Sequence, residues 1–141
     1  MSGTTLRIII AAVLFIHGIG HFMGIMPALQ LVDVTGWNSR SWLLTPLIGE
    51  TASRILSIVL FLAALVGFVA AALALVGWLV PHESWRTLAV VSAVISIVTI
   101  ALFWNAFVSL IPNKVGALGV DIVVLVCLLV LNWPSEAAIG Y

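Results

Sequence analysis

Hydrophobic residues occur along this chain in long runs that are broken only by short polar stretches. A helix needs about 20 predominantly apolar residues to cross the hydrocarbon core of a bilayer. Four runs are long enough or nearly so, and they cover residues 6–28, 51–80, 87–111 and 115–133. Proline, which ends helices, lies at or just after the end of each run, as Pro27, Pro81, Pro112 and Pro134. The pattern predicts an all-α integral membrane protein, a bundle of four transmembrane helices.

The connections between these predicted helices indicate a single domain that comprises residues 1–141. The two later connections are short, so the last three helices should be antiparallel neighbours. The first connection, residues 29–50, is the longest and contains Trp37 and Trp42. Because tryptophan favours the headgroup region, we expect this tryptophan-rich loop to lie at the membrane interface, as a short amphipathic helix or a cap. An even number of spans places both termini on the same side of the membrane.

The composition agrees with a membrane location. Of the 141 residues, 64% are apolar and 7% are charged, and the mean hydropathy is +1.33. Five basic and five acidic residues give a net charge of zero, which excludes the basic surface that binds nucleic acid. The N-terminal run lacks a signal-peptide cleavage pattern, so we expect a retained helix.

Polar residues inside the runs are the candidates for function, because polar groups are costly in a bilayer. His17 and His21 are four residues apart and fall about 40° apart on one helix face. Gly20 and Gly24 would let another helix approach this face closely. A metal ion needs further ligands, and haem held by two histidines needs them on opposite sides, so we predict no metal site. The histidines either bind a ligand or form hydrogen bonds between helices.

Four further polar residues accompany the histidines. Glu50 and Arg54 are four apart at the start of the second run, an order that favours an ion pair within the helix. Asn105 falls in the third run, and Asp121 is the only carboxylate clearly inside a predicted span. A carboxylate at this depth must be paired, protonated or hydrated, and Lys114 is close enough in sequence to be its partner.

Small residues in the second and third runs recur at helical spacing. Glycine and alanine do so in the second run, and serine and threonine do so in the third. We interpret both series as surfaces for close helix packing. Their members are Ala63, Gly67 and Ala71, and Ser92, Ser96 and Thr99.

The candidate residues share one half of the bilayer. With 1.5 Å per residue counted from the middle of each run, His17 lies near the centre and the others lie toward the first loop. A polar pocket in an apolar bundle suits an amphipathic molecule with a hydrogen-bonding head, such as a quinone or another lipid. We therefore predict a ligand-binding site made by His17, His21, Glu50, Arg54, Asn105 and Asp121.

Two stretches of the sequence resemble the DoxX-like family of small four-span membrane proteins. The first comprises Leu6-Arg7 and the later segment LFIHGIGHF, and the second comprises Gly49-Glu50 and the apolar run that follows. The resemblance implies a four-helix fold in a prokaryotic cytoplasmic membrane. It also implies a link to respiratory or sulfur redox chemistry, with His17, His21 and Glu50 lining a quinone headgroup pocket.

Two functions from different classes agree with these features. The first is binding of a quinone or lipid as a subunit of a membrane redox complex. The chain lacks recognisable motifs for a flavin, an iron–sulfur cluster or a nucleotide, so we expect no intrinsic cofactor and leave open whether it is an enzyme. The second is a non-catalytic accessory subunit that packs against larger membrane proteins or forms a homo-oligomer. An ion transporter would need a continuous polar path, which the sequence does not offer.

Overall fold

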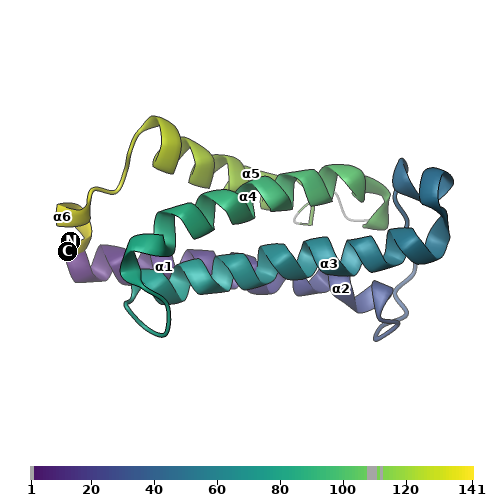
Figure 1. Cartoon of the computed structure of the whole chain (residues 1–141), viewed down its shortest axis with the longest axis horizontal. Coiled ribbons are helices and arrows are strands. Elements are labelled where there is room, and N and C mark those ends of the chain that lie inside the picture. Colours follow the sequence, from purple (N-terminus) through teal and green to yellow (C-terminus); the bar gives the residue numbers. More distant parts are fainter. Residues whose placement is uncertain (1, 108–110, 112) are drawn as a thin grey trace.

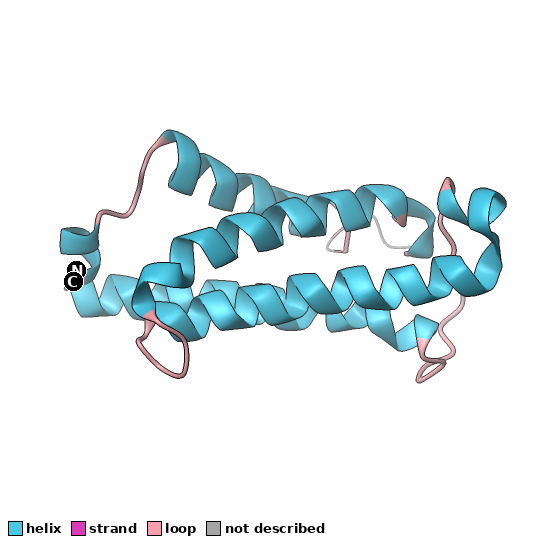
Figure 2. Ribbon diagram, in the orientation of Figure 1, coloured by secondary structure: helices cyan, strands magenta, loops and turns pink. Residues whose placement is uncertain are grey.

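The computed structural model describes residues 2–107, 111 and 113–141, which form helices and no strand (Figures 1 and 2). The all-α prediction is therefore confirmed. The α-helices are α1 (Gly3–Gly20), α2 (Phe22–Ala28), α3 (Leu44–Leu75), α4 (Trp85–Leu102), α5 (Val115–Leu125) and α6 (Glu136–Ile139). Three shorter turns accompany them, the 3-10 turns η1 (His82–Ser84) and η2 (Trp104–Ala106) and the π-helical turn η3 (Val126–Val130).

Three helical stretches among the described residues are long and apolar enough to cross a membrane. They are Gly3–Ala28, Leu44–Leu75 and His82–Leu102. The stretch Val115–Val130 is also helical and apolar, but it is shorter than a typical span. The structure thus supports a membrane protein with three helices able to cross the bilayer.

The observed helices begin and end at different residues from the predicted ones. The second predicted span extends to residue 80, but α3 ends at Leu75 and Gly77 follows with a φ of 71°. A left-handed glycine just beyond a helix is a common terminator. The third predicted span extends to residue 111, but α4 ends at Leu102. The apolar residues that follow α4, such as Phe103 and Phe107, are buried in a turn and in extended backbone.

The first loop lies against the end of α4. Helix α3 begins at Leu44, inside the predicted loop, and kinks at Gly49, where φ is 83°. A short helical segment therefore precedes the long part of α3, as Figure 1 shows. The Ser41 hydroxyl donates to the carbonyl of Leu102, and the Trp42 indole donates to the carbonyl of Ala101 at 2.8 Å. These bonds satisfy carbonyls that the end of α4 leaves unpaired.

Small residues fill many of the contacts between helices, while many large aliphatic side chains are exposed. Helices α3 and α4 contribute alanines that are fully buried, namely Ala64, Ala71, Ala74, Ala89 and Ala93. A Cβ atom on Gly67 would lie 2.1 Å from Oγ of Ser92, so these two helices pack with their backbones close together. Bilayer proteins use this arrangement because lipid solvates the large apolar side chains.

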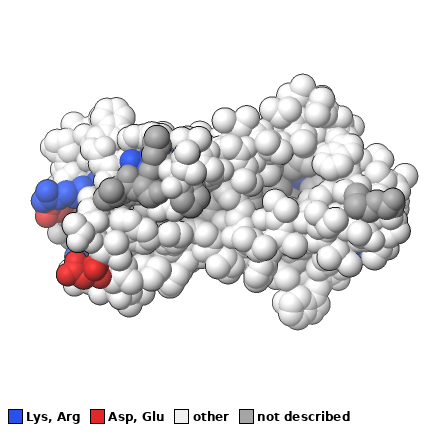
Figure 3. Space-filling model, turned by 180° about the vertical axis from the view of Figure 1, so that it is seen from behind, with Lys and Arg blue, Asp and Glu red and all other residues white. Residues whose placement is uncertain are grey.

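Charged side chains gather at the ends of the bundle. Figure 3 shows them mainly at one end of the face in view, while the broad middle of that face is uncharged. Arg40 and Glu50 form an ion pair at the first-loop end. Glu136 is 3.6 Å from Arg86 at the opposite end. An uncharged band between two charged ends is the distribution expected for a membrane protein.

The two chain termini lie side by side at that opposite end (Figure 1). Helix α6 packs against the start of α1, where Gly3 approaches Gly140 closely. The guanidinium of Arg7 lies 4.7 Å from the ring centre of Tyr141, and the ring of His82 stacks on the same tyrosine at 3.5 Å. The last residues of the chain are therefore held to the first helix and to η1.

The attachment of α6 should depend on pH through Glu136. The hydrogen bond from His82 to this carboxylate, 2.9 Å long, lowers the pKa of Glu136 below its ordinary value of 4.5. A carboxyl with a lowered pKa stabilises the folded state above its ordinary pKa, and that contribution is lost as the pH falls through the lowered value. We expect α6 to detach as the pH falls below 4.5 and through the lowered pKa, as followed by the protection of the amides of residues 136–141 against hydrogen exchange. In Glu136→Gln the protection factors, which compare each amide with its intrinsic exchange rate at the same pH, should not change across this range. An equal loss of protection in this variant would contradict the assignment.

Candidate functional site

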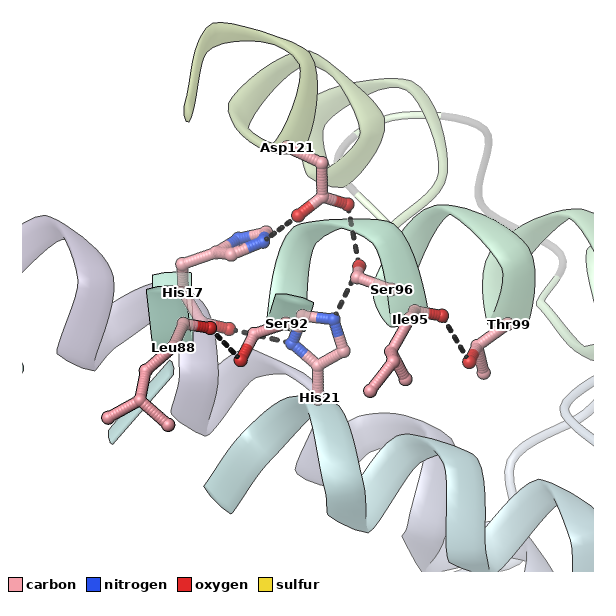
Figure 4. Close-up of polar contacts among 8 residues, drawn as sticks. All are labelled: His17, His21, Leu88, Ser92, Ile95, Ser96, Thr99 and Asp121. Carbon is pink, nitrogen blue, oxygen red and sulfur yellow. Dashed lines mark hydrogen bonds and ion pairs between the residues drawn. The ribbon is translucent and has the colours of Figure 1, made fainter. Parts of the chain in front are cut away.

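Four side chains from three helical segments form one hydrogen-bonded network in the middle of the bundle (Figure 4). Nε2 of His17 lies 2.8 Å from Oδ1 of Asp121. The Ser96 hydroxyl lies 2.6 Å from Oδ2 of the same carboxylate and 2.7 Å from Nε2 of His21. The network therefore connects the first helical stretch with both α4 and α5.

A break in the first helical stretch lets His21 join this network. The His21 backbone N–H bonds to the carbonyl of Gly18, which leaves the His17 carbonyl without its usual helical donor. Nδ1 of His21 donates to that His17 carbonyl at 3.0 Å. The side chain thus replaces a missing backbone hydrogen bond, and its ring is held in one orientation.

Asp121 is an isolated acidic group inside the bundle. Its side chain is 0% exposed and Ser96 is 0% exposed, while His17 retains 9% exposure. Burying a carboxylate without partners is strongly unfavourable, and here each carboxylate oxygen has one. The predicted partner Lys114 is not used, because its ammonium group lies over the ring of Trp104, 5.0 Å from the ring centre.

Two phenylalanines of α3 pack against the histidines. The Phe68 ring lies edge-on to His17 with centres 4.7 Å apart, and it also contacts His21 at 5.7 Å. The Phe61 ring lies 6.3 Å from His21. These rings fix the imidazoles and exclude water from the side of the network on which they lie.

A pocket of about 490 Å³ opens beside the histidines. It lies between the first helical stretch and the N-terminal half of α5, and it also includes Phe107 and Asn113. A Cβ atom on Gly20 would meet nothing within 4 Å, so this glycine faces open space. The pocket is largely apolar, and His17 and His21 are polar groups in its wall. Such a site accommodates an apolar molecule that carries a small polar head.

The glycines around the site have different roles from those predicted. Gly24 packs closely, because a Cβ atom there would lie 2.6 Å from Cγ of Phe61. Gly18 also packs closely, because a Cβ atom on Gly18 would lie 2.9 Å from Cβ of Phe68. A Cβ atom on Gly20 would contact nothing. The expected close approach is therefore found at Gly24, whereas Gly20 faces open space.

The structure brings together three of the six predicted site residues, namely His17, His21 and Asp121. Glu50 pairs with Arg40 at the first-loop end instead of with Arg54, because the kink at Gly49 turns the chain just before it. Arg54 is half-buried and lines a separate, more polar cavity of about 500 Å³ beside the first loop. Glu50 lines the same cavity.

Asn105 lies outside the network as well. It falls in η2, beyond the end of α4, and it is exposed. Its backbone carbonyl accepts a hydrogen bond from the Asn38 side chain at 3.3 Å. The predicted placement of Asn105 inside a span was wrong, because the helix ends before the apolar run does.

Ser96 belongs to the network but was not among the predicted site residues. It was grouped with Ser92 and Thr99 as part of a packing surface, and those two do bond to carbonyls of their own helix, Leu88 and Ile95, each at 2.6 Å. Ser96 instead bridges His21 and Asp121. The sequence does contain a signal for this role. A buried carboxylate such as Asp121 needs more than one hydrogen-bond partner, and a hydroxyl in the middle of a predicted span, such as Ser96, can supply one.

The chemistry of this site is that of hydrogen bonds and protons. Among the described residues, no group of three or more histidine, cysteine, aspartate or glutamate side chains is placed to hold a metal ion. Two imidazoles, a hydroxyl and a carboxylate in sequence can hold and redistribute protons.

Comparisons with family models, with curated proteins and with solved structures gave no match. The resemblance to the DoxX-like family therefore stays a prediction from the sequence.

Proposed function

We propose that this protein crosses the membrane four times and binds an amphipathic lipid or quinone in the pocket beside His17 and His21. The observation that carries the proposal is the position of a largely apolar pocket of about 490 Å³ directly against a buried polar network. The largely apolar walls suit the apolar body of such a molecule. Its polar head would bind where the histidines supply hydrogen-bonding groups.

The fourth crossing is assigned to α5 and η3. Asp121, on α5, bonds to His17, which lies in the C-terminal half of a helix long enough to span the bilayer. A helix that shares a hydrogen bond at this depth is expected to lie in the hydrocarbon region as well, which supports a fourth crossing. With four crossings, the adjacent termini lie on one side of the membrane, and the first loop lies at the other.

The proposal includes a role as a subunit of a membrane redox complex. A network of imidazole, hydroxyl and carboxylate groups next to a quinone head suits proton exchange with it. Electrons would have to come from a partner protein that carries a redox cofactor. The resemblance to the DoxX-like family agrees with such a role.

A substitution at Gly20 tests the binding proposal. We expect Gly20→Leu to fill the pocket and to remove bound ligand, because the new side chain has open space at Cβ and points toward the pocket. The matched control is Gly119→Leu on α5, where a Cβ atom also meets nothing within 4 Å but which does not line the pocket.

The measurement is mass spectrometry of lipids and quinones that co-purify with the protein in nanodiscs. The original chain and Gly119→Leu should retain a ligand near one per protein, and Gly20→Leu should retain less than about a tenth of that amount. Equal retention by all three proteins would place the ligand outside this pocket. Recovery of larger membrane proteins without any small molecule would favour the accessory-subunit function instead.

A further inference from the structure

The hydrogen-bonding groups of the network restrict where its protons lie. A backbone carbonyl only accepts hydrogen bonds, so Nδ1 of His21 must carry the proton in its 3.0 Å bond to the His17 carbonyl. The other nitrogen of His21 faces Ser96. Nδ1 of His21 is therefore always protonated. Whether Nε2 also carries a proton depends on whether Ser96 donates to it or accepts from it.

Ser96 has one hydroxyl proton and two close neighbours, Nε2 of His21 at 2.7 Å and Oδ2 of Asp121 at 2.6 Å. If Ser96 donates to a carboxylate, His21 must donate to Ser96 and is a cation. If Asp121 is protonated and donates to Ser96, then Ser96 donates to a neutral His21. The two arrangements have the same net charge, and they differ only in the positions of two protons along the same pair of bonds.

In both arrangements Oδ1 of Asp121 is an acceptor, so Nε2 of His17 must donate to it. With a neutral His17 the network as a whole carries no net charge, which the interior of an apolar bundle favours. A neutral imidazole with its proton on Nε2 has a lone pair on Nδ1. No described residue donates a hydrogen bond to Nδ1 of His17, and His17 lines the pocket. Nδ1 is thus the acceptor that His17 can offer to a molecule bound in the pocket.

We propose that the pocket selects an amphipathic molecule with a hydroxyl head, a phenol or hydroquinone, which donates its hydrogen bond to Nδ1 of His17. The inference rests on the proposed function and specifies its ligand. A quinone carbonyl would bring a second lone pair against Nδ1, and both acceptors would lack a partner. The hydroquinone form is therefore bound in preference to the quinone.

The remaining polar groups near the head do not reverse this preference. His21 has both nitrogens engaged, with Ser96 and with the His17 carbonyl. Asn113 also lines the pocket, but an amide can donate or accept and so accommodates either head. His17 is the group that distinguishes a donor from an acceptor.

A pair of probes tests the inference without changing the protein. Para-nonylphenol and its methyl ether have the same apolar tail and ring, but only the phenol can donate a hydrogen bond. In phosphatidylcholine nanodiscs we expect the phenol to bind about ten-fold more tightly, since the ether leaves the acceptor unpaired. Gly20→Leu should abolish saturable binding of both probes, and Gly119→Leu should affect neither.

Nitrogen-15 NMR of the three histidines supplies a direct readout. The free protein at neutral pH should show an unprotonated Nδ1 on His17, and the phenol should shift that signal while His82, in η1 at the end of the bundle, stays unchanged. A protonated Nδ1 in the free protein, or equal affinity for both probes, would overturn the inference and leave the binding proposal intact. Absence of saturable binding by either probe would overturn both.

Discussion

Replacing Asp121 with alanine is expected to lower the free energy of unfolding by about 2–4 kcal/mol. The carboxylate is fully buried and accepts from Nε2 of His17 at 2.8 Å. It also bonds to the Ser96 hydroxyl at 2.6 Å. Without it, His17 loses its acceptor and Ser96 loses one of its two hydrogen-bond partners in the interior of the bundle. The measurement is unfolding of purified protein in mixed micelles with increasing sodium dodecyl sulfate, followed by far-ultraviolet circular dichroism.

Asp121→Asn is the matched control for this experiment. The asparagine carbonyl can accept from His17, and its amide can donate to Ser96, which then donates to His21. This variant reproduces the hydrogen bonds of the arrangement with a protonated aspartic acid, so we expect a loss of less than about 1 kcal/mol. A loss equal to that of alanine would show that the negative charge, and not the hydrogen bonds, holds the network together.

The second large effect is expected from Gly24→Ala. A Cβ atom at this position would lie 2.6–2.7 Å from three carbons of the Phe61 ring, which is shorter than any normal contact. Phe61 is 2% exposed and has little room to move. Overpacking of this kind costs about 1–3 kcal/mol, and we expect a loss in that range by the same unfolding measurement.

Two further variants isolate the contact between Gly24 and Phe61. Gly20→Ala adds the same methyl group to the preceding turn, where no atom lies within 4 Å, and it should cause no loss of stability. In a Phe61→Leu background the smaller side chain leaves room for the methyl group, so Gly24→Ala should cost much less there. An equal cost in both backgrounds would mean that the contact is not the cause.

The helical class of the fold was predictable because apolar runs of this length have few other stable arrangements. The ends of the helices were less predictable. An apolar run indicates that its residues are buried or face lipid, but it does not indicate that all of them are helical. Phe103 and Phe107, for example, are buried but not helical. The kink at Gly49 was also missed, because a glycine in a predicted loop does not reveal whether it will lie inside a helix or whether its φ is positive.

The centre of the site was predictable for a different reason. His17, His21 and Asp121 are polar residues in apolar surroundings, and such residues in a bilayer are expected to seek one another. Glu50 and Arg54 were placed wrongly because groups near a helix end have solvent and several charged neighbours as alternatives, so that spacing alone does not fix the partner. Ser96 was missed because serine also bonds readily to its own helix, as Ser92 does.

The bond between His17 and Asp121 joins residues 104 positions apart and has a consequence for how the protein is made. A ribosome releases the first helix to the membrane long before it has translated the residue that pairs with that helix. Until then, His17 must be held by water, lipid headgroups or the insertion machinery. Arrival of α5 is therefore the step that gives His17 its partner, and the first helix reaches its final surroundings only when most of the chain has been made.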